Sequence, residues 1–170
     1  MKVTVIANIS VNGRVLLSDN PTHQLPPEAM KFYLEYAHRV GNLVIGLRTF
    51  ENFQKFSQET QNLFKDIEII VLSSKPSVAN GYVFVKSPEE AIAYMASRGI
   101  KEIAVGGGTG TFNAFINKEL VTDIYFNISP VVTGHGGVFG SYENLNSKFK
   151  VTEHKFNDGF IKLHLSSCGS

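Results

Sequence analysis

The most informative stretch of the sequence is Lys101-Glu-Ile-Ala-Val-Gly-Gly-Gly-Thr-Gly-Thr-Phe-Asn-Ala-Phe-Ile-Asn117. It contains the apolar run Ile103-Ala104-Val105, which is typical of the end of a buried strand. Four of the next five residues, 106–110, are glycine, and Phe112, Phe115 and Ile116 then follow at helical spacing. The stretch therefore predicts a strand, a sharp glycine turn and a helix in direct succession.

A turn of this kind is suited to hold an anion. Glycine lets the backbone turn sharply and approach a ligand, and the helix behind it presents unpaired N–H groups and a positive dipole end. The alternative is a tight turn without a ligand, but four glycines exceed what a turn needs. There is no Gly-Lys-Ser/Thr ending of a nucleoside-triphosphate loop, and the stretch comes too late in the chain for the usual dinucleotide fingerprint. We therefore expect a phosphate or pyrophosphate here.

Strands and helices alternate on the N-terminal side of this stretch. Runs rich in β-branched residues predict strands at 3–9, 43–46, 68–72 and 82–86, and another at 123–128. Helices are predicted near Pro27, from Arg48, and from the N-cap Ser87 to Arg98. Residues 16–26 are typical of a long loop, which in a compact domain is more often functional than idle.

The C-terminal part differs from the rest of the chain. Two strand-like runs, 150–156 and 160–165, flank Asn157-Asp158-Gly159, which predicts an antiparallel hairpin. Together with the alternating strands and helices, this predicts an α/β protein with a mostly parallel sheet and an antiparallel edge. At 170 residues, we expect one domain spanning 1–170.

Composition excludes several classes of function. The formal net charge is +1 and there is no basic run, so nothing indicates nucleic-acid binding. No apolar run approaches the length of a membrane span, and the first residues resemble a strand rather than a signal peptide. The lone Cys168 permits neither an internal disulfide nor a cysteine zinc site, and the five histidines show no ligand spacing. We expect a cytoplasmic protein that holds no metal and binds neither nucleic acid nor membrane.

Polar residues gather where the predicted parallel strands end, which is where open parallel sheets bind ligands. These residues are Ala7 and Asn8, Gly46 with Arg48 and Thr49, Ser73, Ser74 and Lys75, Lys86 with Ser87, and Gly106 to Thr111. Hydroxyls, cations and glycines alternate there with little bulk, as a large phosphorylated cofactor requires. The competing interpretation is that Thr49, Ser73 and Ser87 only cap turns or helices, and that Arg48 and Lys75 are solvated surface charges.

Carboxylates are scarce near these strand ends, and Glu28 is the exception. It follows the long loop and stands in the first turn of the first predicted helix. A partly buried carboxyl group there can help to deliver a proton to a substrate nitrogen. The alternative is that Glu28 only complements the helix dipole.

The chain resembles the dihydrofolate reductase superfamily, and most closely the reductase domain of the riboflavin-biosynthesis deaminase/reductase. In the second half, the similarity lies in Gly107 to Ile116, Leu120-Val121-Thr122-Asp123, Pro130 and Gly134-His135-Gly136-Gly137-Val138-Phe139. In the first half, it lies in Ser10-Val11-Asn12-Gly13, Leu25-Pro26-Pro27-Glu28 with Phe32, Gly46-Leu47-Arg48-Thr49-Phe50-Glu51, Val71-Leu72-Ser73-Ser74 and Val85-Lys86-Ser87. The similarity covers essentially the whole chain, and the motifs are specific for the superfamily rather than for a substrate.

The resemblance implies a three-layer sandwich with helices on both faces of the sheet, and a reductase that uses NADPH. The implied cofactor residues are Ala7, Gly46, Arg48, Thr49, Leu72, Ser73, Ser74, Lys75, Lys86, Gly107, Gly108, Thr109, Gly110, Thr111 and Phe112. The glycine turn takes the pyrophosphate, and the Ser73-Ser74 segment with Lys75 faces the adenosine 2′-phosphate. The implied substrate residues are Asn8, Glu28, Phe32 and Phe53, with Glu28 as the catalytic carboxylate.

Three functions are compatible with this resemblance. The first is hydride transfer from NADPH to a pteridine such as dihydrofolate. The second is the reduction of 5-amino-6-ribosylaminopyrimidine or its phosphate in riboflavin biosynthesis, which requires cations near the substrate. The third is a protein that binds NADPH without catalysing a reaction. The resemblance to the riboflavin-type reductases also implies a homodimer, for which the C-terminal hairpin offers an edge.

Overall fold

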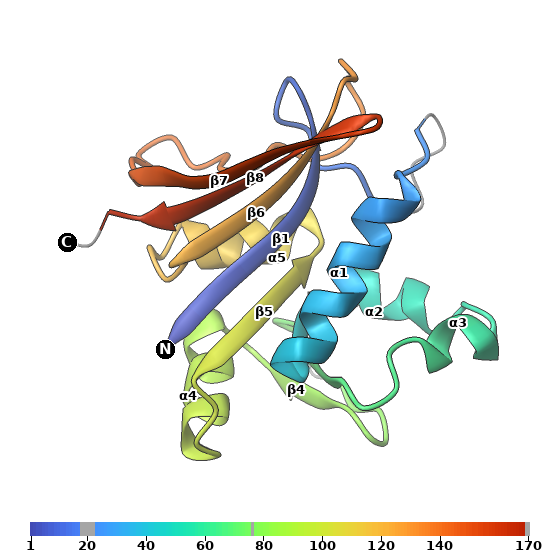
Figure 1. Cartoon of the computed structure of the whole chain (residues 1–170). Helices are drawn as coiled ribbons and strands as arrows, with labels where there is room; N and C mark the ends of the chain where they lie inside the picture. Colours follow the sequence, from blue (N-terminus) through green and yellow to red (C-terminus); the bar gives the residue numbers. More distant parts are fainter. Residues whose placement is uncertain (18–22, 76, 169–170) are drawn as a thin grey trace.

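The computed structural model describes residues 1–17, 23–75 and 77–168 (Figure 1). Within these residues an eight-stranded sheet has the order β4-β3-β2-β5-β1-β6-β8-β7. The strands are β1 (Lys2–Ser10), β2 (Asn42–Gly46), β3 (Glu68–Leu72), β4 (Val83–Val85), β5 (Glu102–Gly107), β6 (Asp123–Ser129), β7 (Phe149–Asn157) and β8 (Phe160–Ser167). All neighbouring strands are parallel except β6–β8 and β7–β8, which are antiparallel. The α/β class and the antiparallel C-terminal hairpin are confirmed.

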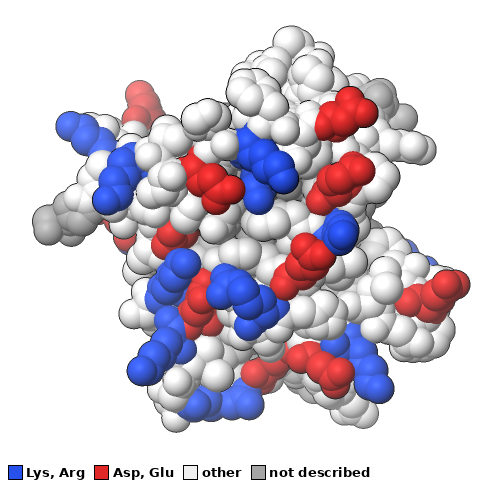
Figure 2. Space-filling model, viewed as in Figure 1, with Lys and Arg blue, Asp and Glu red and all other residues white. Residues whose placement is uncertain are grey.

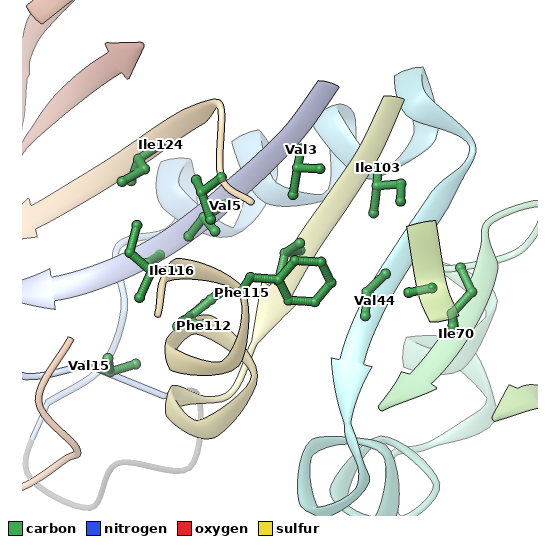
Figure 3. Close-up of a cluster of buried hydrophobic side chains, with 14 of the residues drawn as sticks. Val3, Val5, Val15, Val44, Ile70, Ile103, Phe112, Phe115, Ile116 and Ile124 are labelled. Carbon is green, nitrogen blue, oxygen red and sulfur yellow. The ribbon is translucent and has the colours of Figure 1, made fainter. Parts of the chain in front are cut away.

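Helices cover both faces of the sheet, as expected. They are α1 (Pro27–Val40), α2 (Leu47–Phe53), α3 (Gln58–Asn62), α4 (Pro88–Ser97) and α5 (Thr109–Ile116). On one face, Phe115 and Ile116 of α5 pack on Val3 and Val5 of β1 and on Ile103 of β5 (Figure 3). These side chains are almost completely buried, which is why the helix behind the glycine turn is apolar along most of its length.

The opposite face is covered by α1 and α2. Tyr36 and Ala37 of α1 and Phe50 of α2 are buried with Ile6 of β1 and Ile45 of β2 in a second apolar cluster. β1 is thus buried on both sides and forms the middle of the sheet, between β5 and β6. A strand covered on both faces has a continuous apolar sequence rather than an alternating one, as its run of Val and Ile residues shows.

The helix boundaries follow the expected signals. Pro27 is the first residue of α1, and Gly41, in a left-handed conformation, ends it by donating its N–H to the Ala37 carbonyl at 2.8 Å. The Ser87 hydroxyl caps α4 by accepting from the N–H of Glu90 at 3.2 Å. Of the loop predicted at 16–26, residues 18–22 lie outside the described residues. The short helix α3 was not predicted.

Charged side chains of both signs are interspersed over the face that α1 covers, without a continuous patch of one sign (Figure 2). This distribution agrees with the net charge of +1. In the described part of the chain, no helix combines the length and the apolar character that crossing a membrane requires.

Candidate functional site

The carboxyl ends of β2, β3 and β5 lie side by side, because these strands are neighbours in the sheet and run parallel. A cavity of about 550 Å³ opens there, and we call it the polar cavity. Its lining residues are Leu17, Gly46, Leu47, Arg48, Thr49, Leu72, Ser73, Ser74, Lys75, Gly108, Thr109, Gly110 and Thr111. It is therefore built from the residues that follow three neighbouring strands, including the glycine turn.

Close packing of the glycines shapes this cavity. A Cβ atom on Gly46 would lie 2.6 Å from the Thr111 hydroxyl oxygen, so the start of α2 approaches α5 only because residue 46 has no side chain. Gly107 has φ +117, a conformation that side chains disfavour, and the peptide between Gly107 and Gly108 is cis. At these residues the chain turns from β5 into α5, and the backbone of Gly108 and Gly110 lies against the cavity.

Two cations line the polar cavity. Arg48 and Lys75 are exposed, and within the described ranges neither side chain has a hydrogen-bond or ion-pair partner. The Ser73 hydroxyl is already used, because it donates to the Lys75 carbonyl at 3.0 Å and accepts from the Lys75 N–H at 3.1 Å. Ser73 thus shapes the turn that presents Ser74 and Lys75. Backbone N–H groups, hydroxyls and two unpaired cations are a donor set that fits phosphate groups.

A second cavity of about 120 Å³, the apolar cavity, lies between the sheet and helices α1 and α2. Its lining residues are Ile6, Asn8, Val15, Leu16, Leu17, Leu25, Met30, Tyr33, Leu43, Ile45, Thr49, Asn52, Phe53, Phe56, Phe64, Ile69, Gly106 and Phe112. None of these described residues is an acid, a lysine, an arginine or a histidine. The cavity therefore fits an uncharged, flat ring that forms few hydrogen bonds.

Hydrogen bonds within the protein fix the orientation of two polar side chains in the apolar cavity, Tyr33 and Asn8. The Tyr33 hydroxyl donates to the Gly106 carbonyl at 3.3 Å, and burial raises the pKa of Tyr33 far above its ordinary value, so it remains a neutral donor. On the sheet, the Asn127 side-chain amide donates to the Asn8 Oδ1 atom at 3.0 Å. Tyr33, Met30 and Leu17 were not predicted as site residues. Their sequence pattern is that of core residues, and only their position beside a cavity distinguishes them.

The two cavities adjoin, since Leu17 and Thr49 line both. Ligands bound in the two cavities would therefore lie next to each other, with Leu17 and Thr49 at the boundary. Such an arrangement suits a reaction in which one bound molecule transfers an atom directly to another.

The structure brings together most of the predicted cofactor residues, from Gly46, Arg48 and Thr49 to Ser73–Lys75 and Gly108–Thr111. Four others lie elsewhere. Ala7 is buried within β1, Gly107 is the last residue of β5 and lines neither cavity, and Phe112 lines the apolar cavity instead. Lys86 is exposed at the start of the α4 capping turn, where its N–H donates to Glu90.

The predicted substrate residues also divide. Asn8 and Phe53 line the apolar cavity, whereas Glu28 and Phe32 line neither cavity. The expectation of a partly buried Glu28 is wrong, because Glu28 is exposed. Helical geometry explains this: residues 28 and 32 share one side of α1, and the cavity-facing Met30 and Tyr33 lie on the other.

Phe32 packs toward the far strands of the sheet. Its ring lies 5.1 Å from that of Tyr125 and 5.9 Å from that of Tyr36, and the Lys162 ammonium lies 4.4 Å from its centre. Its observed role is to anchor α1 to β6 and β8, which the sequence pattern does not distinguish from a wall of the substrate site.

Comparisons with known proteins agree with this architecture. The sequence model of the family described as RibD C-terminal domain matches residues 1–159. A solved structure from Shewanella sp. PV-4, described as a riboflavin biosynthesis protein, has a TM-score of 0.77 at 19% identity, covering 99% of this chain and 100% of that one. A pyrimidine reductase-like protein from Corynebacterium diphtheriae has a TM-score of 0.77 at 11% identity, covering 99% and 92%. At these identities the structures show a shared fold. No protein of curated function matches the sequence.

Proposed function

The chain belongs to the RibD C-terminal domain family, a family of reductase type, and we propose that it is an NADPH-dependent reductase that transfers hydride to a substituted pyrimidine. The substrate class is that of 5-amino-6-ribosylaminopyrimidine or its phosphate. The apolar cavity would hold the ring alone, because its described lining offers no cation for a phosphate group. The family and the descriptions of the two structural neighbours support a pyrimidine rather than dihydrofolate. A cytoplasmic location and a homodimer belong to the same proposal.

The observation that carries the proposal is the pair of adjoining cavities with different chemistry. The polar cavity supplies backbone N–H groups at Gly108 to Gly110 and the cations Arg48 and Lys75, which would hold the phosphates of NADPH. When bound, NADPH supplies the hydride. Thr49 and Leu17 stand where the two cavities meet, and they would set how the reacting rings face each other.

The apolar cavity does not favour a pterin ring. The resemblance assigned pterin binding to the Glu28 carboxylate, but Glu28 is exposed and lies outside both cavities. Among the described residues, neither Glu28 nor any other acid lines the apolar cavity. A 2-amino pterin would thus present its donor edge to walls that hold no carboxylate.

The experiment that tests the function measures NADPH oxidation by absorbance with the ribosylaminopyrimidine, its phosphate and dihydrofolate in parallel. We expect turnover with a pyrimidine substrate, slower turnover with dihydrofolate, and weaker activity with NADH as cofactor. Faster turnover with dihydrofolate would contradict the substrate assignment. Tight NADPH binding without turnover on any of the three would favour a non-catalytic binding protein.

Lys75→Ala tests the cofactor assignment without relying on turnover. We expect its Kd for NADPH, measured by fluorescence, to rise about tenfold, because one charge-assisted phosphate contact is lost. The Kd for NADH should change much less if Lys75 contacts the 2′-phosphate. Lys65→Ala removes an exposed lysine that lines neither cavity and serves as the control. Equal weakening of NADPH and NADH would contradict the assignment to the 2′-phosphate.

A further inference from the structure

Asn127 is a buried polar residue that lines neither cavity. It lies on β6 directly beside Asn8 of β1, because the parallel register of the two strands pairs these residues. Its residue surface is only 1% exposed, and its amide nitrogen donates to Asn8 Oδ1 at 3.0 Å. Its own Oδ1 atom is buried and has no hydrogen-bond partner. Burying a polar side chain costs free energy unless hydrogen bonds compensate for the loss of water, so the single hydrogen bond of Asn127 calls for an explanation.

The consequence of this contact falls on Asn8, which lines the apolar cavity. Because the Asn8 oxygen accepts from Asn127, the Asn8 NH₂ group is left to face a ligand. Among the described residues, no side chain or carbonyl accepts a hydrogen bond from that NH₂ group. Asn8 therefore presents a donor, rather than an acceptor, to a ring bound in the cavity.

The opposite arrangement is less favourable. Turning both amides over would let the Asn8 NH₂ donate to Asn127 Oδ1, but would leave both N–H bonds of Asn127 buried without an acceptor. The observed arrangement leaves one N–H and one oxygen of Asn127 unpaired. Since buried N–H groups are left unpaired more rarely than oxygens, burial of Asn127 fixes the direction in which the pair points.

We propose that Asn127 is a positioning residue that fixes Asn8 as a hydrogen-bond donor and so selects rings with a carbonyl edge. The inference rests on the proposed function, because it assumes that the apolar cavity holds the substrate ring. A carbonyl oxygen accepts from the Asn8 amide, whereas an amino group at the same ring position places donor against donor. The site thus distinguishes oxo-pyrimidines from their amino counterparts although none of the described residues of the cavity wall is charged.

Two small rings of matched shape test this. 5,6-Diaminouracil carries two ring carbonyls, and 2,4,5,6-tetraaminopyrimidine carries amino groups in their place. Their Kd values would be measured by calorimetry with NADP⁺ present, at mildly alkaline pH. We expect the wild type to prefer diaminouracil by about tenfold, the effect of one mismatched hydrogen bond. Equal affinity, preference for the amino ring, or no binding of either ring would overturn the inference.

Three variants separate the roles of the two residues. Asn8→Asp replaces the donor with an acceptor, so the preference should reverse. Asn127→Leu keeps the volume but releases the Asn8 amide, so the preference should fall to about twofold or less; Asn127→Ser serves if the leucine variant does not fold. Asn80→Asp, in an exposed turn, is the control and should keep the wild-type preference. A wild-type preference retained by both Asn127 variants would overturn the positioning role.

The ring affinities and the turnover assay fail independently. Diaminouracil selectivity without NADPH oxidation on any substrate would contradict the proposed reductase function but support this inference. Turnover on the pyrimidine substrate without that selectivity would support the reductase function and contradict this inference. The NADPH Kd of each variant should stay at the wild-type value, because neither Asn8 nor Asn127 lines the polar cavity.

Discussion

Among the glycines that line the two cavities, Gly106 leaves the least space for a side chain. A Cβ atom there would collide with the Tyr33 hydroxyl and would lie 2.7 Å from Leu43 Cδ1. We expect Gly106→Ala to lower the free energy of unfolding by about 1–3 kcal/mol, because the buried Leu43 and the half-buried Tyr33 must both move. Thermal or denaturant unfolding measures this directly.

Gly110→Ala is the matched control for that variant. Gly110 stands in the first turn of α5, and a Cβ atom there meets nothing within 4 Å. Its stability should equal or slightly exceed that of the wild type, because alanine is the better helix former. A Gly106→Ala protein as stable as Gly110→Ala would contradict the prediction, because it would show that Tyr33 and Leu43 can move aside without loss of stability.

Individual site residues were predictable where the backbone sets their role. The glycines of residues 106–110 indicate a close approach whatever surrounds them, and the hydroxyls and cations after β2 and β3 did gather at one cavity. Glu28 was misplaced because a residue's side of a helix depends on how the helix rotates against the sheet. Asn127 was missed because a single asparagine in a strand carries no signal of what lies beside it.

At the scale of secondary-structure elements, the Asp123 carboxylate of β6 forms hydrogen bonds with side chains of β8. His164 Nε2 lies 2.9 Å from its Oδ1 atom, Ser166 donates to the same oxygen at 3.0 Å, and Thr122 donates to Oδ2 at 2.9 Å. We expect Asp123→Asn to destabilise the fold by about 1–3 kcal/mol near neutral pH, because charge-assisted hydrogen bonds are lost. Urea unfolding compared with the wild type measures this loss.

The contribution of Asp123 to the free energy of unfolding depends on pH. Burial alone raises the pKa of its carboxyl group, but the hydrogen bonds from His164, Thr122 and Ser166 and the charge of Lys2 outweigh burial, so the pKa lies below its ordinary value of 3.8. A lowered pKa stabilises the folded state above the ordinary value, and this contribution is lost as the pH falls through the folded one. The stability difference between wild type and Asp123→Asn should shrink as the pH falls below about 4. A difference that grows in acid would contradict this.

Most elements were predictable, and the exception shows why. The inner strands β1, β2, β3 and β5 were visible because they are buried and therefore form continuous apolar runs, and α1 and α4 have proline at their first position. Helix α3 spans only Gln58–Asn62 and has no buried residue, so it lacks the apolar periodicity that reveals longer helices. Its one local signal is the Ser57 cap, which accepts from the N–H of Thr60 at 3.2 Å.

At the scale of the whole molecule, β7 is an edge of the sheet and is exposed along almost all of its length. Val151 and Phe156 on it are 60% and 75% exposed. An exposed edge strand with apolar side chains is a template for pairing with another chain, so we expect a homodimer that uses β7. Light scattering should give twice the mass of the chain, and replacing Val151 and Phe156 with lysine should give a monomer.

Val78→Lys is the control for this substitution, because Val78 is 94% exposed and lies far from β7 in the sequence. It should leave the mass unchanged. A wild-type protein with the mass of one chain would contradict dimerisation, and a double-lysine variant that stays dimeric would move the interface away from β7.

The adjacency of the two cavities could not be predicted from the sequence alone. The rule that ligands bind beyond the carboxyl ends of parallel strands identified the residues of the polar cavity. Which strand ends are neighbours depends on the strand order, and the order β3-β2-β5-β1 is set by long-range packing that local patterns do not encode. The shared wall of Leu17 and Thr49 follows from that order.

The central place of β1 has a consequence for how the protein is made. β1 spans Lys2–Ser10 and leaves the ribosome before β5 and β6, the two described strands that flank it, whose last residues are Gly107 and Ser129. The backbone hydrogen bonds between β1 and β6 therefore cannot form until the chain has been synthesised as far as Ser129. Contacts so distant in sequence slow folding and leave an apolar strand exposed to self-association during synthesis. Cotranslational chaperones that bind extended apolar segments would therefore have β1 as a target from its emergence until β6 has been synthesised.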